Sequence, residues 1–369
     1  MCRTRIIAAI SHAGAIAGLI VAALASLPAG AQPAPFCPLA ERREVCVRPA
    51  CIVDPAVPKP NWHDAAQCMR NLRDVWAASA KDPTARQASA DFARRYVEFA
   101  IMQPSQAAPR DGAAALLVER NQRGEAFNAM GQGGVAYFLL QFARLAQVGD
   151  TSAAANWYRE LAVRAIEALL NPVESGGFVR RTPCGDKECA WFHSVTRRDW
   201  SGSEGGTLNQ DLHAIRDLLL IANGRFALPP ELEQRLDATV EAALRQLLAG
   251  TDPSTPTLDG YFPPGSRQSL AFYGARLGRQ SAPAYYYLGR GTLDCHYHVH
   301  ATELLFQIMT EAGKRPRLVA LAQQGLACGS PLWRYDAAIR AVRATPARAT
   351  CDSRDIARYR PPSPLPCGG

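Results

Sequence analysis

The sequence lacks several patterns that would point to particular classes of protein. It has no pair of cysteines spaced C-x-x-C, so a cysteine-based zinc site is disfavoured. It has no lysine and arginine run interleaved with aromatic residues, which argues against nucleic acid as a partner. Long series of alternating strand patterns are also absent, and this leaves a mainly helical fold.

The first 31 residues have the order of a secretory signal peptide. The basic start "MCRTR" is followed by an apolar stretch and then by the small residues Ala29 and Ala31, two positions apart. No basic stop-transfer flank follows, so no transmembrane segment is expected after cleavage. A mature protein starting near Gln32 would be periplasmic or secreted. It would keep six of the eight net positive charges, which suits an anionic partner.

Ten cysteines follow the expected cleavage site, and an even number in an exported protein predicts disulfides and no free thiol. Cys184 and Cys189 are the best local pair because a Gly-Asp turn between them can close a hairpin. Most of the others crowd a proline-rich segment at 32–82 and a tail at 348–369. Disulfides are expected to staple these two terminal segments.

Helical periodicity dominates the remaining region, 83–347. In "PPELEQRLDATVEAALRQLLAG", apolar residues recur every three or four positions, Pro230 stands at the first turn, and Gly250 marks the exit. Similar patterns begin near residues 137, 152, 208 and 300. Shorter β pieces are expected at "GGFVRR" and "DGYF". Further helices are expected over residues 84–101, 111–120, 315–327 and 333–346.

Successive helical patterns of this kind predict a layered array of α-hairpins, either closed or open. Two long polar loops, 173–206 and 251–296, each precede a strongly periodic helix. Binding residues concentrate on loops held by a rigid scaffold, so we expect both loops to lie on one rim and to carry the site.

Three stretches resemble the C-terminal domain of the glucuronyl C5-epimerases, over about residues 130–330. They are "YFLLQFARLAQVGDTSAAANWYRELAVRAIEALL", "TLNQDLHAIRDLLLI" and "HYHVHATELLFQIMTEAGKRPRLVALAQQ". The resemblance implies an all-α fold, an (α/α) toroid of helical hairpins with minor β-hairpins. It also implies C5 epimerisation of uronate residues in an anionic polysaccharide, with no cofactor. Oligomeric state stays open.

The resemblance places an acid/base tyrosine at Tyr297, beside His298. Tyr273 in "SLAFYGARLG" is the nearest counterpart of a second family tyrosine. Here His300 follows His298 by two positions, whereas the family has three. Removing a proton beside a carboxylate requires a base, an acid and a group that neutralises the carboxylate.

Further site candidates come from the loop before residue 208 and the helix that follows it. Arginines can clamp carboxylates, a tryptophan can stack on a sugar ring, and the carboxyl, amide and imidazole groups can bind or transfer protons. Each also has a structural reading: a solvated arginine pair, an acid at a helix start, or a histidine that only bonds a neighbouring helix. These candidates are Arg197, Arg198, Trp200, Glu204, His193, Asn209 and His213.

The segment "TLDCHYHVHATELLF" places three histidines in five positions. On a strand His296, His298 and His300 would face one way, as zinc ligands do, whereas on a helix only the first and last align. Because the run 300–312 predicts a helix, acid/base chemistry without metal is the preferred interpretation. A metal-dependent hydrolase and a non-catalytic glycan-binding or envelope-assembly protein are the alternatives. Epimerisation and β-elimination share the same carbanion, so a lyase is not distinguished from an epimerase.

Overall fold

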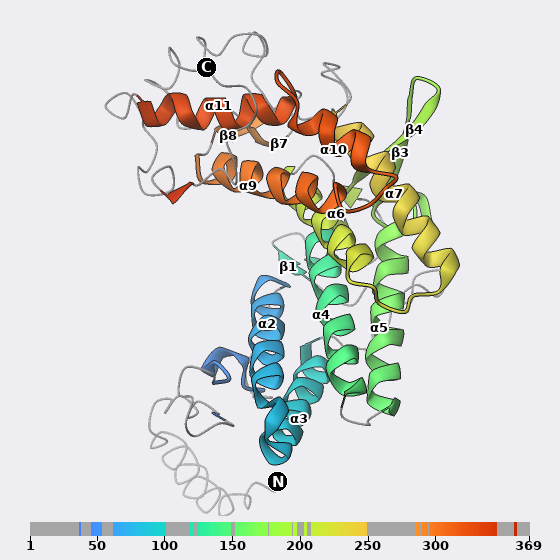
Figure 1. Cartoon of the computed structure of the whole chain (residues 1–369), viewed down its shortest axis with the longest axis vertical. Helices are drawn as coiled ribbons and strands as arrows, with labels where there is room; N and C mark the ends of the chain where they lie inside the picture. Colours follow the sequence, from blue (N-terminus) through green and yellow to red (C-terminus); the bar gives the residue numbers. More distant parts are fainter. Residues whose placement is uncertain are drawn as a thin grey trace, which may run out of the picture.

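The structure is a computed structural model, and it is mostly helical (Figure 1). The description covers residues 37, 46–53, 62–100, 119–121, 124–148, 152–175, 177–193, 195–197, 203–204, 208–248, 285–287, 290–293, 295–344 and 358–359.

The N-terminal part of the helical body is formed by four helices. They are α2 (Trp62–Ala78), α3 (Pro83–Ala100), α4 (Ala129–Gln147) and α5 (Ser152–Leu170). Short 3-10 turns, η1 (Pro49–Cys51) and η2 (Ser79–Lys81), precede α2 and α3. Helix α4 packs against both α2 and α5, and α3 packs against α2. The rings of Trp76, Phe142 and Tyr158 join α2, α4 and α5, with centroids 5.5 to 6.2 Å apart.

The C-terminal part continues with α6 (Leu208–Asn223), α7 (Pro230–Leu248), α9 (Cys295–Ala312), α10 (Val319–Leu326) and α11 (Pro331–Ala344). Helix α6 packs against α4 on one side and against α9 on the other. The order α2, α4, α6, α9 is therefore a continuous series of neighbouring helices. Helices α3, α5, α7 and α10 each follow one member of that series in the chain and pack against it.

A close approach at Gly133 sets the position of α6 on α4. A Cβ atom at residue 133 would lie 3.1 Å from the Cβ of Asp217, so a larger side chain would push the two helices apart. The neighbouring Gly134 faces Asp217 and also Ala66 of α2. Two glycines in one helix thus allow three helices to meet closely around one buried carboxylate.

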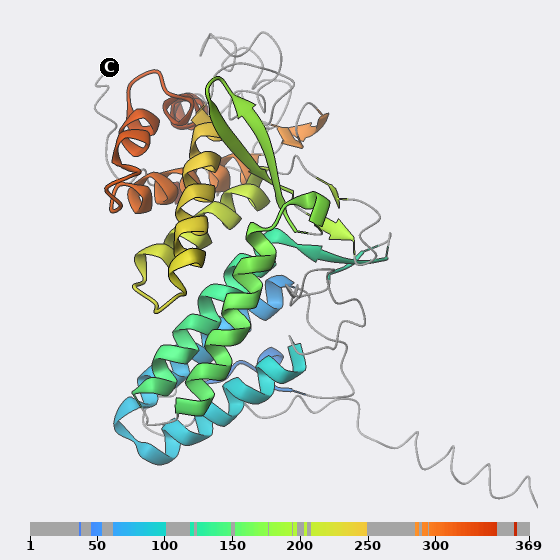
Figure 2. The same ribbon diagram turned by 90° about the vertical axis from the view of Figure 1, so that its right-hand side faces the viewer.

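Within the described residues, eight short strands accompany the helices. They are β1 (Glu119–Asn121), β2 (Gly124–Asn128), β3 (Val179–Cys184), β4 (Lys187–Phe192), β5 (Val195–Arg197), β6 (Ser203–Glu204), β7 (Tyr285–Tyr287) and β8 (Arg290–Leu293). The strands form one antiparallel sheet in the order β1-β2-β5-β6 and two hairpins, β3–β4 and β7–β8. A further 3-10 turn, η3 (Val173–Ser175), leads into β3. In Figure 2 the sheet β1-β2-β5-β6 and the hairpin β7–β8 lie to the right of the helices, whereas the hairpin β3–β4 lies over α7.

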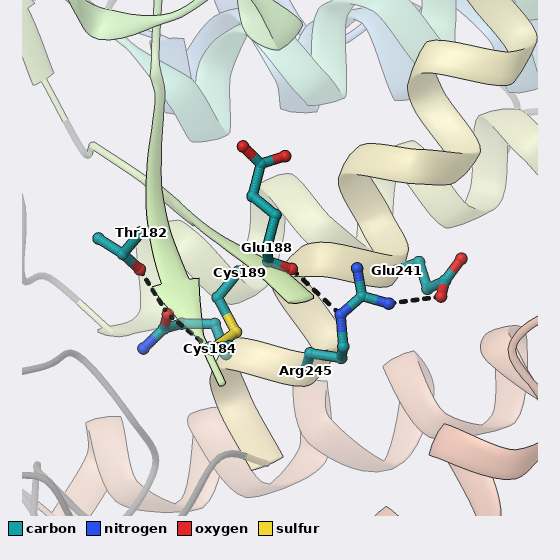
Figure 3. Close-up of a disulfide and its surroundings, with 7 residues drawn as sticks. Thr182, Cys184, Glu188, Cys189, Glu241 and Arg245 are labelled. Atoms are coloured by element: carbon teal, nitrogen blue, oxygen red, sulfur yellow. Dashed lines mark hydrogen bonds and ion pairs between the residues drawn. A yellow bond between two sulfur atoms is a disulfide. The ribbon is translucent and has the colours of Figure 1, made fainter. Parts of the chain in front are cut away.

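The predicted pair Cys184–Cys189 is confirmed, at the tip of the β3–β4 hairpin (Figure 3). The hairpin rests on α7, where Arg245 donates to the carbonyl of Glu188 and pairs with Glu241. Two further disulfides, Cys37–Cys46 and Cys51–Cys68, staple the N-terminal segment as expected.

Cys328 is also disulfide-bonded, to a cysteine whose side chain is not described. Disulfides persist in oxidising compartments, which fits an exported protein. No helix in the described ranges is long and apolar enough to cross a membrane.

The structure corrects the sequence prediction in three places. Helix α2 lies inside the segment 32–82, which shows little periodicity, and it packs into the main core. Residues 119–121 form a strand, although a helix is expected over 111–120, and they belong to a sheet without a sequence signal. Helix α9 begins at Cys295, five residues before the expected start. The strand expected at "DGYF" lies outside the described residues.

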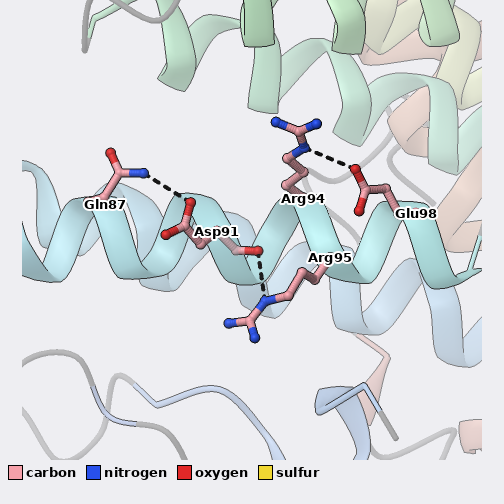
Figure 4. A network of polar contacts seen from close by, with 5 residues as sticks. All are labelled: Gln87, Asp91, Arg94, Arg95 and Glu98. Carbon is pink, nitrogen blue, oxygen red and sulfur yellow. Dashed lines mark hydrogen bonds and ion pairs between the residues drawn. The ribbon is translucent and has the colours of Figure 1, made fainter. Parts of the chain in front are cut away.

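Helix α3 shows how the exposed faces are stabilised. Gln87 bonds Asp91, and Arg94 pairs with Glu98 at 2.9 Å, each across one helical turn (Figure 4). The opposite face buries Tyr96, Val97 and other residues against α2. This division between a charged and an apolar face is the periodicity that predicts the helix from sequence.

Candidate functional site

A strand precedes each of the helices α4, α6 and α9, and the strands before α4 and α6 belong to one sheet. Strand β2 runs into α4 and pairs with β5, with Asn128 opposite Val195. Asn128 also caps α4 by accepting the N–H of Gly131 at 3.1 Å. Strand β6 precedes α6, and β7 contacts α6. The described parts of the loops 173–206 and 251–296 therefore both lie at α6.

Two histidines, one from each of the neighbouring helices α6 and α9, face each other. The Nε2 atoms of His213 and His300 are 2.8 Å apart, and the ring centroids are 5.0 Å apart. At this distance one nitrogen donates a proton and the other accepts it. Both rings are half-buried. Such a pair can take up or release a proton within hydrogen-bond reach of a bound molecule.

A cleft of about 550 Å³ runs along the same two helices. From α6 it is lined by Arg216 and Leu220, which stand one and two turns after His213. From α9 it is lined by residues that include Glu303, one turn after His300. Neither histidine lines the cleft itself, and the pair stands about one helical turn before the first lining residue of each helix. The other lining residues are Phe306, Gln307, Thr310, Glu311 and Tyr359.

Arg216 brings a positive charge to the cleft and is oriented by a buried carboxylate. Its Nε and one terminal nitrogen lie 2.9 and 2.6 Å from Oδ1 of Asp217, which is 2% exposed. Burial raises the pKa of Asp217, and Arg216 opposes this shift through its charge and hydrogen bonds. The guanidinium is thus held in place by α6 itself and can attract a carboxylate of a ligand.

The opposite face of α6 ties the helix to the end of β4. Oδ1 of Asp211 accepts the backbone N–H of Phe192 at 2.8 Å, and Asp211 is fully buried. Its Oδ2 has no hydrogen-bond partner among the described residues. Burial raises the pKa of Asp211 well above its ordinary value, partly offset by the Phe192 N–H. The contact fixes the start of α6, from which His213 projects.

His193 follows Phe192 at the end of β4, and its backbone N–H donates to the carbonyl of Phe178 at 2.7 Å. Only 8% of the residue is exposed. Burial lowers the pKa of His193, and Arg180 lowers it further, while Glu174 opposes the shift. A neutral imidazole is therefore favoured here, which suits an acceptor or a base.

The remaining candidates are placed only in part. Tyr297 and His298 lie in the first turn of α9, and Asn209 lies in the first turn of α6. Arg197 ends β5 and Glu204 ends β6. The side chains of these five are not described. Tyr273, Arg198 and Trp200 lie outside the described residues.

The helical backbone of α9 determines how the positions of the histidine cluster are arranged. Positions 296 and 297 stand about one turn before His300 on the α9 backbone, whereas position 298 lies about 160° around the helix from positions 296 and 300. A strand presentation of His296, His298 and His300 is not adopted, because α9 already includes all three. Among the described side chains no group of three metal-ligating residues gathers.

Arg216, Glu303 and Asp211 are not singled out as site residues by the sequence patterns. A signal does exist: "HAIR" in α6 and "HATE" in α9 each carry a histidine with a charged residue three positions later. On a helix this spacing puts both side chains on one face. What the sequence does not reveal is that the two faces meet.

Asp211 supports a test of the local electrostatics. Because its folded-state pKa is raised, the folded protein binds a proton that the unfolded chain releases near pH 4. The stability contribution of Asp211 is therefore lost as pH rises from about 4 towards the raised folded-state pKa. Asp211→Asn keeps an acceptor for Phe192, so the variant should gain stability over wild type as pH increases from 4.5 to 8.

Urea unfolding at several pH values measures this difference. Asp186→Asn, an exposed change in the β3–β4 turn, is the matched control and should leave the pH dependence unchanged. A constant difference between Asp211→Asn and wild type at all pH values would contradict the raised pKa.

Comparisons with known proteins leave the family of this chain open. No family model matches the sequence, and no curated protein matches it. Among solved structures, one titled "Crystal structure of D-mannose isomerase" matches with a TM-score of 0.42 and 11% identity. That match covers 80% of this chain and 67% of the other. Similarity at this level carries no conclusion about activity, so the function is argued from the chain's own residues.

Proposed function

We propose that the protein is an exported enzyme that removes the proton at C5 of a uronate residue in an anionic polysaccharide. The observation that carries this proposal is the 2.8 Å contact of His213 and His300, one helical turn from a cleft lined by Arg216 and Glu303. A base, a carboxylate-binding cation and a further acid are the groups that this reaction needs.

One imidazole of the pair takes the C5 proton as the C–H bond breaks, and its partner orients it. The electron pair left on C5 spreads into the carboxylate, whose growing charge is stabilised by Arg216. Return of a proton to the opposite face completes an epimerisation. Expulsion of the group at C4 instead completes an elimination.

Tyr297 is proposed as the second proton-transferring group. Its backbone position is one turn before His300 on α9, and the resemblance to the glucuronyl C5-epimerases assigns the role. Within this proposal Arg197, Arg198, Trp200, Asn209 and His193 contact the polysaccharide, and His298, Tyr273 and Glu204 remain candidates for proton transfer.

We also infer that the helices form an (α/α) toroid. The series α2, α4, α6, α9 is supported as an inner layer by the packing of each member against the next. The helices that follow them, α3, α5, α7 and α10, would form the outer layer. The starts of the inner helices would then share one end, at which β2 and β6 precede α4 and α6.

A periplasmic or secreted location, after removal of residues 1–31, belongs to the same proposal. Three described disulfides favour an oxidising compartment. An exported protein would meet cell-surface or extracellular polysaccharides, which are commonly anionic.

Incubation with uronate polymers in deuterated water tests the function. We expect deuterium at C5, with unsaturated chain ends in addition if the enzyme is a lyase. Binding without exchange would instead support a non-catalytic glycan-binding protein, and neither binding nor exchange would reject the substrate class.

Tyr297→Phe tests the role of the tyrosine. The change removes only a hydroxyl group, so packing is nearly conserved, and loss of a catalytic acid or base costs about a hundredfold or more in rate. We expect C5 exchange to fall by that amount with an unchanged unfolding temperature. Exchange at the wild-type rate would show that the tyrosine does not transfer the proton.

A further inference from the structure

A residue near the C-terminus belongs to the wall of the cleft. Tyr359 lines it together with residues of α6 and α9, although 48 or more positions separate it from every one of them. The tyrosine is buried, with 1% of its surface exposed. Its ring is therefore a packed part of the wall.

The hydroxyl group of Tyr359 joins this wall to α11. It donates a hydrogen bond to Oδ1 of Asp336 at 2.7 Å. Oδ2 of the same carboxylate lies 2.7 Å from Nε of Arg340, so both oxygens of Asp336 are engaged. Asp336 is itself 2% exposed, and hydrogen bonds to buried charged acceptors are among the stronger ones in proteins.

The electrostatic surroundings keep this hydroxyl protonated. Burial raises the pKa of Tyr359 most, and the hydrogen bond and negative charge of Asp336 raise it further. The negative charge of Glu303, another residue of the cleft wall, also raises the pKa of Tyr359. The group therefore serves as a permanent donor, in contrast to a tyrosine that must lose its proton to act as a base.

We propose that Tyr359 is a positioning residue of the cleft: its hydrogen bond to Asp336 fastens residues 358 and 359 to α11 and thereby holds the α9 wall that carries Glu303. Helix α11 packs directly against α9, so the bond connects three parts of the chain at one point. The ligand class, a uronate polysaccharide, rests on the proposed function. The claim that Tyr359 holds the α9 wall in place does not depend on it.

Hydrogen exchange of the full-length protein tests the proposal directly. In Tyr359→Phe the hydroxyl is lost, the ring remains, and one oxygen of Asp336 stays buried without its donor. We expect amides of α9 from about residue 303 to 311, and those of α11, to exchange about tenfold faster. Affinity for a glucuronate oligosaccharide, measured by calorimetry, should fall by about the same factor.

Tyr96→Phe is the matched control. It removes the hydroxyl of another buried tyrosine, on α3, for which the described residues offer no hydrogen-bond partner. We expect neither exchange at α9 nor affinity to change in this variant.

Three outcomes would decide between the claims. Unchanged protection of α9 in Tyr359→Phe would overturn the positioning role. Faster exchange with unaltered affinity would overturn its importance for the ligand. If the wild-type protein does not bind the oligosaccharide, the proposed function fails, while the exchange data still decide whether Tyr359 orders the wall.

Discussion

Replacing His213 by glutamine should reduce C5 proton exchange on a uronate polymer by about a hundredfold or more. Glutamine keeps a polar atom near the position of Nε2 and can still bond His300, so the packing of α6 on α9 is retained. It has no group that takes up and releases a proton near neutral pH. The loss should therefore appear in the chemical step, with little change in binding.

His300→Gln should have a similar effect, because the two rings act as one unit. The double variant should then be little worse than either single variant, since residues of one catalytic unit are strongly non-additive. Thermal unfolding and calorimetric binding provide the controls for fold and affinity. If the losses of the single variants multiplied in the double variant, the rings would be acting separately.

Arg216→Met should destabilise the protein by about 3 kcal/mol at neutral pH, because it leaves a buried carboxylate without its partner. The side chain of Asp217 is 3% exposed, between α4 and α6, and the guanidinium provides its closest compensation. Methionine retains the length and apolar stem of arginine, so the change isolates the charge. Loss of the cleft's cation should also abolish affinity for uronate oligosaccharides.

The pH dependence of Arg216→Met follows from Asp217. Burial already raises the pKa of this carboxyl, and removing the arginine raises it further. A raised folded-state pKa means stability that is present at low pH and lost as pH rises, so the defect should be smaller at pH 5 than at pH 8. Urea unfolding at both pH values measures it.

Two further variants make this result specific. Adding Asp217→Asn to Arg216→Met removes the uncompensated charge and should recover much of the stability. Arg94→Met removes an exposed arginine whose pair with Glu98 lies on the surface of α3, and it should change stability little. Equal losses in the Arg94 and Arg216 variants would contradict the role of the buried pair.

The helices were predictable where a single face is apolar. Helix α7 begins at Pro230 as predicted, and its apolar positions from Leu232 to Leu247 are buried. In α2 the buried Ala65, Met69 and Leu72 also have helical spacing, but cysteines and a proline-rich approach surround them. The cysteines and prolines around α2 therefore argued against a helix in the sequence. In the structure the packing of these residues on α4 stabilises the helix.

The candidate site was predictable only in its parts. His213 stands out on a helical stripe beside an apolar face, and His300 stands out in a dense cluster. Neither local pattern predicts the contact between the two rings, because 87 positions separate the histidines whose Nε2 atoms lie 2.8 Å apart. Arg216 and Glu303 gain significance only when the faces of α6 and α9 line one cleft.

The sequence by itself determined the helical class of the protein, the Cys184–Cys189 pair and the apolar face of long helices such as α5, α6 and α7. These features depend on groups a few positions apart: helical hydrogen bonds, side-chain periodicity and a tight turn. Tertiary structure alone decided the β1-β2-β5-β6 sheet, the pairing of His213 with His300, and the place of Tyr359. Each of these features joins segments that are distant along the chain. Such contacts form only when the free energy of packing compensates for the entropy lost on closing long loops.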